Sequence, residues 1–158
     1  MQLEPEAEEA KALTKQRAKF NFVTIRDIID SVHDMKQLDL CGINITKEPK
    51  KDDIEVKYDG KQKLKGRLTF AIVDRTEEAI NVNLWGELSN IELGEMDIVL
   101  INGGRMSNFG GGNNSMVKAL GKTINCAAEY CKVFINPSRE LAPNLGDFVD
   151  LSLSNMAA

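Results

Sequence analysis

Residues 80–85 contain the pattern that most restricts the fold of this chain. Apolar and polar side chains alternate there with a period of two, which indicates a β-strand with one buried face and one outward face. The outward face is unusual, because it carries two amides and the only tryptophan of the sequence. A tryptophan on the polar side of a strand is more typical of a contact residue than of core packing. The two faces consist of Ile80, Val82 and Leu84 against Asn81, Asn83 and Trp85.

Other short segments also have strand character and are separated by turn residues. A hydrophobic content of 42% is enough for a real core. A regular alternation of strands and helices would favour a parallel sheet, and the sequence does not show one. We therefore expect an all-β fold, a small five-stranded barrel with short flanking helices. The strands are predicted at 38–46 (bent at Gly42), 68–73, 80–85 and 98–101, and an apolar stretch follows at 124–135.

The segments between these strands predict short helices, turns and one long loop. Isoleucines at helical spacing after Thr24 predict a short capped helix over 25–32. Residues 88–93 predict a short helix or turn, and 138–148 a short helix broken at Pro143. The polar residues 47–63 predict a long loop, or a hairpin extension around Asp59-Gly60. We expect a flexible or loosely helical leader at 1–19, one folded domain at 20–149 and a tail at 150–158.

The charge of the chain is unevenly distributed. Its net charge of −4 argues mildly against nucleic acid, because phosphate binding usually needs a basic face. Residues 61–67, however, carry four basic residues and no acid. In a strand, Lys61, Lys63, Lys65 and Arg67 would all point to one side and form a stripe about two phosphates long. The alternative is an ordinary solvated face. No apolar run is long enough to suggest a membrane span, and the acidic N-terminus does not resemble a signal peptide.

Patterns for metal binding and catalysis are missing from the sequence. Cys41, Cys126 and Cys131 lack CxxC spacing, and His33 is the only histidine, so we expect free thiols in a reducing compartment and no metal or other cofactor. No nucleophile, base or carboxylate pair forms a recognisable constellation, and we expect no enzyme activity. Gly121-Lys122-Thr123 resembles the end of a P-loop. Met116 stands where the first glycine is required, so the motif fails.

Four motifs of the chain resemble the large subunit of replication protein A, specifically its second central DNA-binding domain. They occur in the order and at the spacing of that family, over roughly residues 20–148. The combination of Leu-Trp-Gly-Glu with Asn-Phe-Gly-Gly is the specific part. The motifs are Phe20-Asn21-Phe22, Leu84-Trp85-Gly86-Glu87, Gly104-Arg105-Met106-Ser107-Asn108-Phe109-Gly110-Gly111 and the weaker Ile135-Asn136-Pro137.

The resemblance implies an OB-fold, a Greek-key barrel that holds single-stranded DNA on its second and third strands and on two loops. Trp85 and Phe109 match the family's two base-stacking aromatics, and Arg105 matches a basic contact residue. The basic residues at 61–67 fall near the family's basic loop and second strand. Four amides could donate hydrogen bonds to base edges: Asn83, Asn108, Asn113 and Asn114. The Gly110–Gly112 run is then the tip of a loop that closes over the ligand.

Three departures from the family pattern suggest a diverged paralogue. The chain is acidic, Gly112 with Asn113 and Asn114 replaces an arginine, and residues 116–137 are longer than expected. Relatives associated with telomerase, telomeres or meiosis are known, and the sequence does not choose among them. The implied partners are single-stranded DNA, with telomeric DNA as one candidate, and other subunits of a replication protein A-like or telomerase-associated complex. The implied location is the nucleus. The alternative is a protein-interaction OB domain, in which an exposed Trp85 would contact a partner chain.

Overall fold

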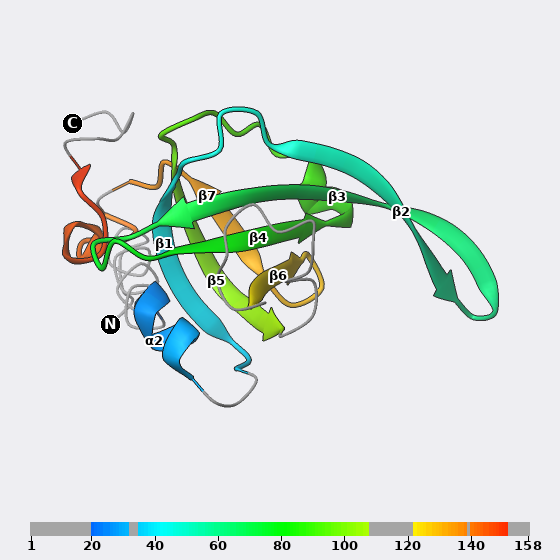
Figure 1. Cartoon of the computed structure of the whole chain (residues 1–158), viewed down its shortest axis with the longest axis horizontal. Coiled ribbons are helices and arrows are strands. Elements are labelled where there is room, and N and C mark those ends of the chain that lie inside the picture. The colour runs from blue at the N-terminus through cyan, green and yellow to red at the C-terminus, as the bar shows by residue number, and fades with distance from the viewer. Residues whose placement is uncertain (1–19, 32–34, 108–121, 139, 152–158) are drawn as a thin grey trace, which may run out of the picture.

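The computed structural model describes residues 20–31, 35–107, 122–138 and 140–151. These residues form a mainly β structure with a projecting hairpin (Figure 1). The elements are α2 (Ile25–Asp30), β1 (Leu38–Asn44), β2 (Lys50–Tyr58), β3 (Lys61–Val73), β4 (Ala79–Trp85), η1 (Gly86–Asn90), β5 (Ile98–Ser107), β6 (Thr123–Ala127), β7 (Lys132–Ile135) and η2 (Leu145–Asp147).

Five of the strands close into a ring. The order is β1-β3-β4-β6-β5, and β5 pairs again with β1. The β4–β6 pair is parallel, whereas the other pairs of the ring are antiparallel. Among the described strands, β2 pairs only with β3, and β7 extends the sheet beyond β5. This topology confirms the predicted all-β OB-fold, with β1, β3, β4, β5 and β6 as its five barrel strands.

Strand β1 closes the barrel, and Gly42 permits the closure. Leu38 to Ile43 pair with β5, while Ile43 and Asn44 pair with the end of β3. At the crossing, a Cβ on Gly42 would lie 2.9 Å from the carbonyl oxygen of Val73. Only a glycine allows the two backbones to approach this closely. The bent strand predicted at Gly42 is therefore present, although it ends at Asn44 rather than at residue 46.

The core inside the barrel is closed at one end by helix α2. Ile25 and Ile28 are fully buried there, among the inward-facing residues of the barrel strands. Thr24 caps the helix as predicted, in a reciprocal capping box with Asp27. At the other end of α2, the Lys122 ammonium donates to the carbonyl oxygens of Ile28, Ile29 and Ser31. Lys122 therefore holds the C-terminal carbonyls of a helix, a structural role unlike that of a phosphate-binding P-loop lysine.

A second buried cluster covers the outside of β1 and β5. The segment at Phe20 and Phe22 packs there against Phe134 and Phe148, and Leu145 of η2 is buried beside them. Strand β1 is consequently buried on both faces. The sequence predicted a helix over 138–148. The described residues of this range form only one helix, the three-residue 3-10 helix η2. The proposed leader at 1–19 lies outside the described residues, as does nearly all of the tail, and the division into 1–19, 20–149 and 150–158 stays a prediction.

Residues 50–69 form a long hairpin where the sequence favoured a loop. Strands β2 and β3 pair without interruption from Lys50↔Thr69 to Tyr58↔Lys61. Asp59 and Gly60 make the turn with φ angles of 50° and 74°, as a tight two-residue hairpin requires. The hairpin alternative is therefore correct and the long loop over 47–63 is wrong. Figure 1 shows the hairpin reaching far beyond the barrel.

The other strands differ from prediction mainly in length. Strand β5 runs through Gly103 and Gly104 to Ser107, whereas the sequence predicted a strand only over 98–101. The apolar stretch 124–135 contains two strands, β6 and β7, joined by a turn. Residues 86–90 form the 3-10 helix η1, in place of the helix or turn expected at 88–93.

Candidate nucleic-acid interface

Four neighbouring strands place polar side chains side by side on the outer face of the barrel. At one level of the sheet, Thr69 of β3 pairs with Asn83 of β4, Asn83 with Asn125 of β6, and Asn125 with Arg105 of β5. We call these four residues the amide row. Paired residues point to the same face of a sheet. Because none of the four is fully buried, the row forms part of the molecular surface.

Hydrogen bonds tie the amide row to Trp85. The indole Nε1 donates to Asn125 Oδ1 at 3.0 Å, and Asn83 Nδ2 donates to the same oxygen at 3.4 Å. The Thr69 hydroxyl donates to Asn83 Oδ1 at 2.8 Å. An indole N–H can only donate, so its bond orients the Asn125 amide and restrains the ring. Trp85 is therefore a partly exposed aromatic group held in place by its polar neighbours.

Arg67 lies beside Trp85 and is also paired with an acid. Its Cζ is 5.6 Å from the centre of the indole ring, a cation–π distance. The guanidinium makes two parallel bonds to Asp52, from Nε at 3.1 Å and from Nη2 at 2.9 Å. These bonds from Arg67 hold the pKa of Asp52 below its ordinary value. Arg67 is thus already neutralised in part by the protein.

Arg105 stands over an aromatic ring at the other side of the row. Its Cζ lies 3.7 Å from the ring centre of Tyr130, which follows β6 in the turn at 128–130. Burial raises the pKa of the Tyr130 phenol, and the Arg105 charge opposes that shift. Arg105 remains exposed although its guanidinium lies over the Tyr130 ring. This arrangement presents a positively charged, planar group next to the amides.

The β2–β3 hairpin continues the same outer face and separates its charges. The face that includes Thr69 carries five basic residues and one acid, whereas the opposite face carries two lysines and two acids. The basic stripe predicted from the sequence is therefore an actual row on one strand. On its face lie Lys50, Asp52, Lys61, Lys63, Lys65 and Arg67, and on the other lie Lys51, Asp53, Glu55 and Lys57.

Two surface pockets adjoin these groups. One is lined by Trp85, Gly86, Glu87, Ala128 and Glu129. The other lies against the hairpin and is lined by Val56, Lys63, Leu64, Lys65 and again Glu129. The shared Glu129 connects the end of the barrel face with the base of the hairpin. An extended ligand could follow this path from the lysines to the indole.

The structure brings together most of the residues predicted for the site. Trp85, Asn83, Arg67 and Arg105 share the barrel face, and Lys61, Lys63 and Lys65 extend it along the hairpin. Phe109 and Asn108, together with Asn113 and Asn114, lie outside the described residues. Sequence reasoning missed Asn125 and Tyr130, because both sit in the segment 124–135 that was interpreted only as apolar. The polar Asn125 between Ile124 and Cys126 was the available signal.

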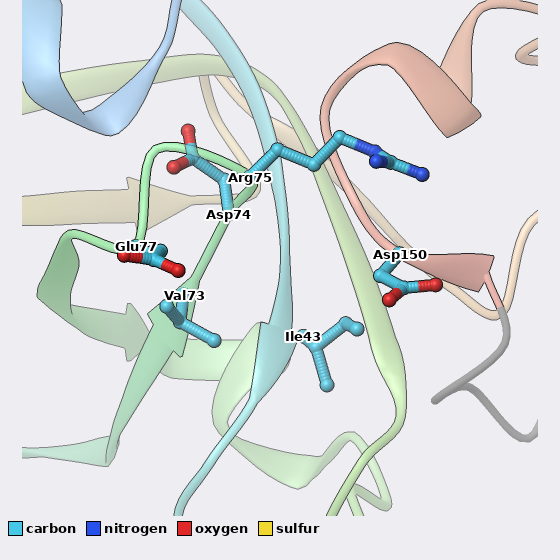
Figure 2. A pocket seen from close by; sticks show the side chains of 6 residues that line it. All are labelled: Ile43, Val73, Asp74, Arg75, Glu77 and Asp150. Carbon is cyan, nitrogen blue, oxygen red and sulfur yellow. The ribbon is translucent and has the colours of Figure 1, made fainter.

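A further pocket lies elsewhere on the barrel, and its polar groups hold the structure together. Figure 2 shows its lining residues, Ile43, Val73, Asp74, Arg75, Glu77 and Asp150. The Asp74 carboxylate accepts from the backbone of Ile25 at 2.8 Å and of Thr76 at 2.9 Å. Arg75 Nε donates to the carbonyl of Val149 at 3.1 Å. These bonds attach the helix and the C-terminal segment to the β3–β4 turn.

All three cysteines are free and buried. Burial and the Asp74 carboxylate raise the pKa of the Cys41 thiol to about 12. The neighbouring Cys131, and then burial, raise the pKa of the Cys126 thiol. No group of three or more histidine, cysteine or acidic residues in the described part of the chain could hold a metal ion. None of the helices formed by these residues is long and apolar enough to cross a membrane.

Comparison with known families identifies the fold and its relatives. The family model for the replication protein A OB domain matches residues 25–125, more than half of the chain. The chain belongs to the replication protein A OB-domain family. This membership confirms the resemblance found in the sequence and is consistent with single-stranded DNA binding. The matched range includes Trp85, Arg105 and Asn125.

Solved structures with the same fold include a replication protein A chain. That chain comes from a heterotrimer bound to single-stranded DNA, and it matches with a TM-score of 0.58 and 17% identity. The match covers 81% of this chain but only 27% of that one. The OB domain of Ta0387 from Thermoplasma acidophilum matches with a TM-score of 0.48 and 19% identity, over 72% of this chain and 85% of that one. No curated protein sequence matches the chain.

Proposed function

We propose that this replication protein A-like OB domain binds single-stranded DNA on the face formed by β3, β4, β6 and β5. The observation that carries the proposal is the position of Trp85. Its ring is partly exposed, its polar atom is already bonded to Asn125, and its neighbours are Arg67 and the basic hairpin. A restrained aromatic group beside cations is what sequence-tolerant binding of single strands requires.

Base stacking and phosphate contacts would supply the affinity. Stacking on an aromatic side chain contributes about 1–3 kcal/mol per base, and every base offers a suitable face. Trp85 is one such platform, and Phe109 is proposed as the second on the strength of its motif. Lys61, Lys63 and Lys65 would follow the phosphates along the hairpin. The expected mechanism is binding alone, without a catalytic step.

The cellular role of the domain is part of the proposal. Family membership supports a general role with single-stranded DNA, and we propose that this role is in DNA replication, repair or telomere maintenance inside the nucleus. Single-stranded DNA, telomeric DNA included, and other subunits of a replication protein A-like or telomerase-associated complex are the proposed partners. The chain spans 27% of the replication protein A chain that it matches. Linked domains gain affinity through effective concentration, so a single module is expected to bind more weakly than a linked array.

Fluorescence titration of Trp85 tests this function, because the protein has one tryptophan. We expect an oligonucleotide of about 12 nucleotides to quench it, given that one OB-fold covers about 4–16 nucleotides. Anisotropy of a labelled oligonucleotide should show that W85A/F109A lowers affinity at least tenfold, while W85F retains most of it. Unchanged affinity in the folded double variant would contradict the proposal.

The second candidate function is protein binding through the same face. It is favoured by the net charge of −4 and by Glu129, an acid placed between the two pockets of the interface. An exposed tryptophan is also a common anchor of protein interfaces. In that case the oligonucleotide leaves Trp85 fluorescence and anisotropy unchanged even at low salt.

A further inference from the structure

The side-chain amides of the amide row have a fixed donor-to-acceptor direction, which is set by the indole of Trp85. Because Nε1 is a donor only, the atom of Asn125 at 3.0 Å from it must be the oxygen. Asn83 approaches that same oxygen at 3.4 Å, so it must do so with its Nδ2 group. The oxygen of Asn83 then faces Thr69, whose hydroxyl donates to it at 2.8 Å. Each amide orientation follows from the one before it.

This direction uses the acceptor of Asn125 and leaves its donor. Asn125 Oδ1 receives two hydrogen bonds, which occupy both of its lone pairs. No described residue accepts a hydrogen bond from Asn125 Nδ2. Arg105, the next residue across the sheet, has a guanidinium that can only donate. A base lying on Trp85 would therefore meet hydrogen-bond donors at Asn125 and Arg105, whereas the acceptors of the adjoining pocket, Glu87 and Glu129, lie outside the row.

The bases differ in what they show to such a surface. Thymine and guanine carry a carbonyl oxygen at the position where cytosine and adenine carry an amino group. The usual asparagine–adenine pair needs the amide oxygen to accept from that amino group. In this protein the Asn125 oxygen is already occupied by the indole and by Asn83.

We propose that the amide row makes the site prefer bases with an exocyclic carbonyl, thymine and guanine, over the amino bases cytosine and adenine. Asn125 is the specificity-determining residue, and its Nδ2 group donates to the base oxygen. Trp85, besides stacking, positions that donor. The inference rests on the proposed function, because it assigns a base preference to the same single-strand site.

Ligands matched in ring size test the preference. Oligonucleotides of deoxyuridine and deoxycytidine differ in a carbonyl against an amino group on the same ring, and deoxyinosine and deoxyadenosine differ in the same way. Comparing within each pair cancels most of the difference in stacking. We expect the unaltered protein to bind the carbonyl member about two- to tenfold more tightly, as one hydrogen bond contributes. Binding is measured by fluorescence anisotropy of labelled strands about 12 nucleotides long.

Asn125→Asp reverses the chemistry with little change in shape. The carboxylate still accepts from Trp85, but an acceptor replaces the outward donor, so the amino bases should become the tighter ligands. The added negative charge should weaken the binding of every oligonucleotide to a similar degree. Its effect therefore cancels in the ratio of affinities within each pair. Ala128→Asp is the matched control, because Ala128 is exposed and lines the pocket at Trp85. It should weaken binding without changing the ratio. Asn125→Leu, which is uncharged, should bring both ratios close to one.

The outcomes separate the two proposals. A carbonyl preference that N125D reverses and A128D preserves supports the inference. Clear binding with equal affinities within each pair, a ratio that neither N125D nor N125L changes, or a shift of the same size in A128D overturns the inference and leaves single-strand binding in place. Absence of binding to every strand overturns the proposed function as well. Trp85 emission and urea unfolding establish which variants are folded before they are scored.

Discussion

The two halves of strand β3 have the same backbone conformation and opposite surroundings. From Leu68 to Val73 the strand lies in the barrel wall, and Phe70 and Ile72 are fully buried. From Lys61 to Gly66 it pairs only with β2 and is largely exposed, and Leu64 keeps 68% of its surface. The half at 68–73 stabilises the fold, whereas the half at 61–66 extends a charged surface away from it. One strand can therefore contribute to the core in one half and to an exposed charged surface in the other, because pairing with β2 continues it beyond the barrel.

The largest effect is expected in the buried half. Phe70→Ala should lower the free energy of unfolding by about 3–5 kcal/mol, because it removes a fully buried ring and leaves a cavity. Leu64→Ala in the outer half is the matched control and should change it by less than about 0.5 kcal/mol. Urea unfolding of both variants measures the difference. Similar losses in the two variants would show that the halves are not energetically separate.

The boundary between the halves lies at Gly66. A Cβ at this position would lie 2.5 Å from Ser89 Oγ, which itself bonds to the carbonyl of Gly86 at 2.6 Å. Gly66→Ala should therefore cost about 1–3 kcal/mol of stability through crowding. Adding Ser89→Ala removes the clashing oxygen, leaving a contact of 3.5 Å to the Ser89 Cβ. Chemical denaturation should show partial recovery in the double variant, and a further additive loss would refute this explanation.

We expect the outer half of β3 and the paired β2 to contribute to nucleic-acid binding through one face of the hairpin only. Lys63→Gln with Lys65→Gln removes two charges from the basic face, while Lys51→Gln with Lys57→Gln removes two from the opposite face. The first pair should reduce the slope of log K against log salt by about 1.4, at about 0.7 per phosphate of a single strand. The second pair should change it by less than about 0.5. Anisotropy titrations over a range of salt measure both slopes, and equal changes would mean that the two faces act alike.

The smallest effect concerns the ion pair on the hairpin. Because Arg67 lowers the pKa of Asp52 in the folded state, the folded protein takes up this proton less readily than the unfolded chain. The resulting stabilisation is complete above the ordinary pKa of about 3.9 and is lost as pH falls through the lower folded value. We expect Asp52→Asn to cost less than about 1 kcal/mol at pH 7 and nothing at strongly acidic pH. Asp53→Asn, on the other face, is the control, and unfolding at several pH values is the measurement.

Local sequence patterns predicted a large part of the fold. Thr24 caps α2, the alternation at 80–85 forms β4, and Asp59-Gly60 turns the hairpin. Strand β2 escaped prediction for a physical reason. Neither face of residues 50–58 enters the core, so burial imposes no apolar pattern on them. The same exposure explains why β3 was predicted to begin at Leu68 and not at Lys61.

Most residues of the candidate interface were predicted from the sequence, but the contacts between them were not. Trp85, Asn83 and Arg105 could be recognised by residue type and family motif. That Asn125 orients Trp85 follows from the parallel pairing of β4 with β6, between residues 40 positions apart. The bond between Arg67 and Asp52 likewise depends on the register of β2 against β3.

The sequence by itself determined that the segments at 38–44, 68–73, 80–85 and 98–101 become strands, which face of β4 turns outward, where helix α2 begins and which family the chain resembles. These properties depend on side-chain periodicity, capping and turn residues, which act over a few neighbouring positions. The tertiary structure alone decided that four outward residues from separate strands form one row, and which of their atoms remain for a ligand. Such contacts depend on the register of strands distant in sequence, which local patterns do not specify.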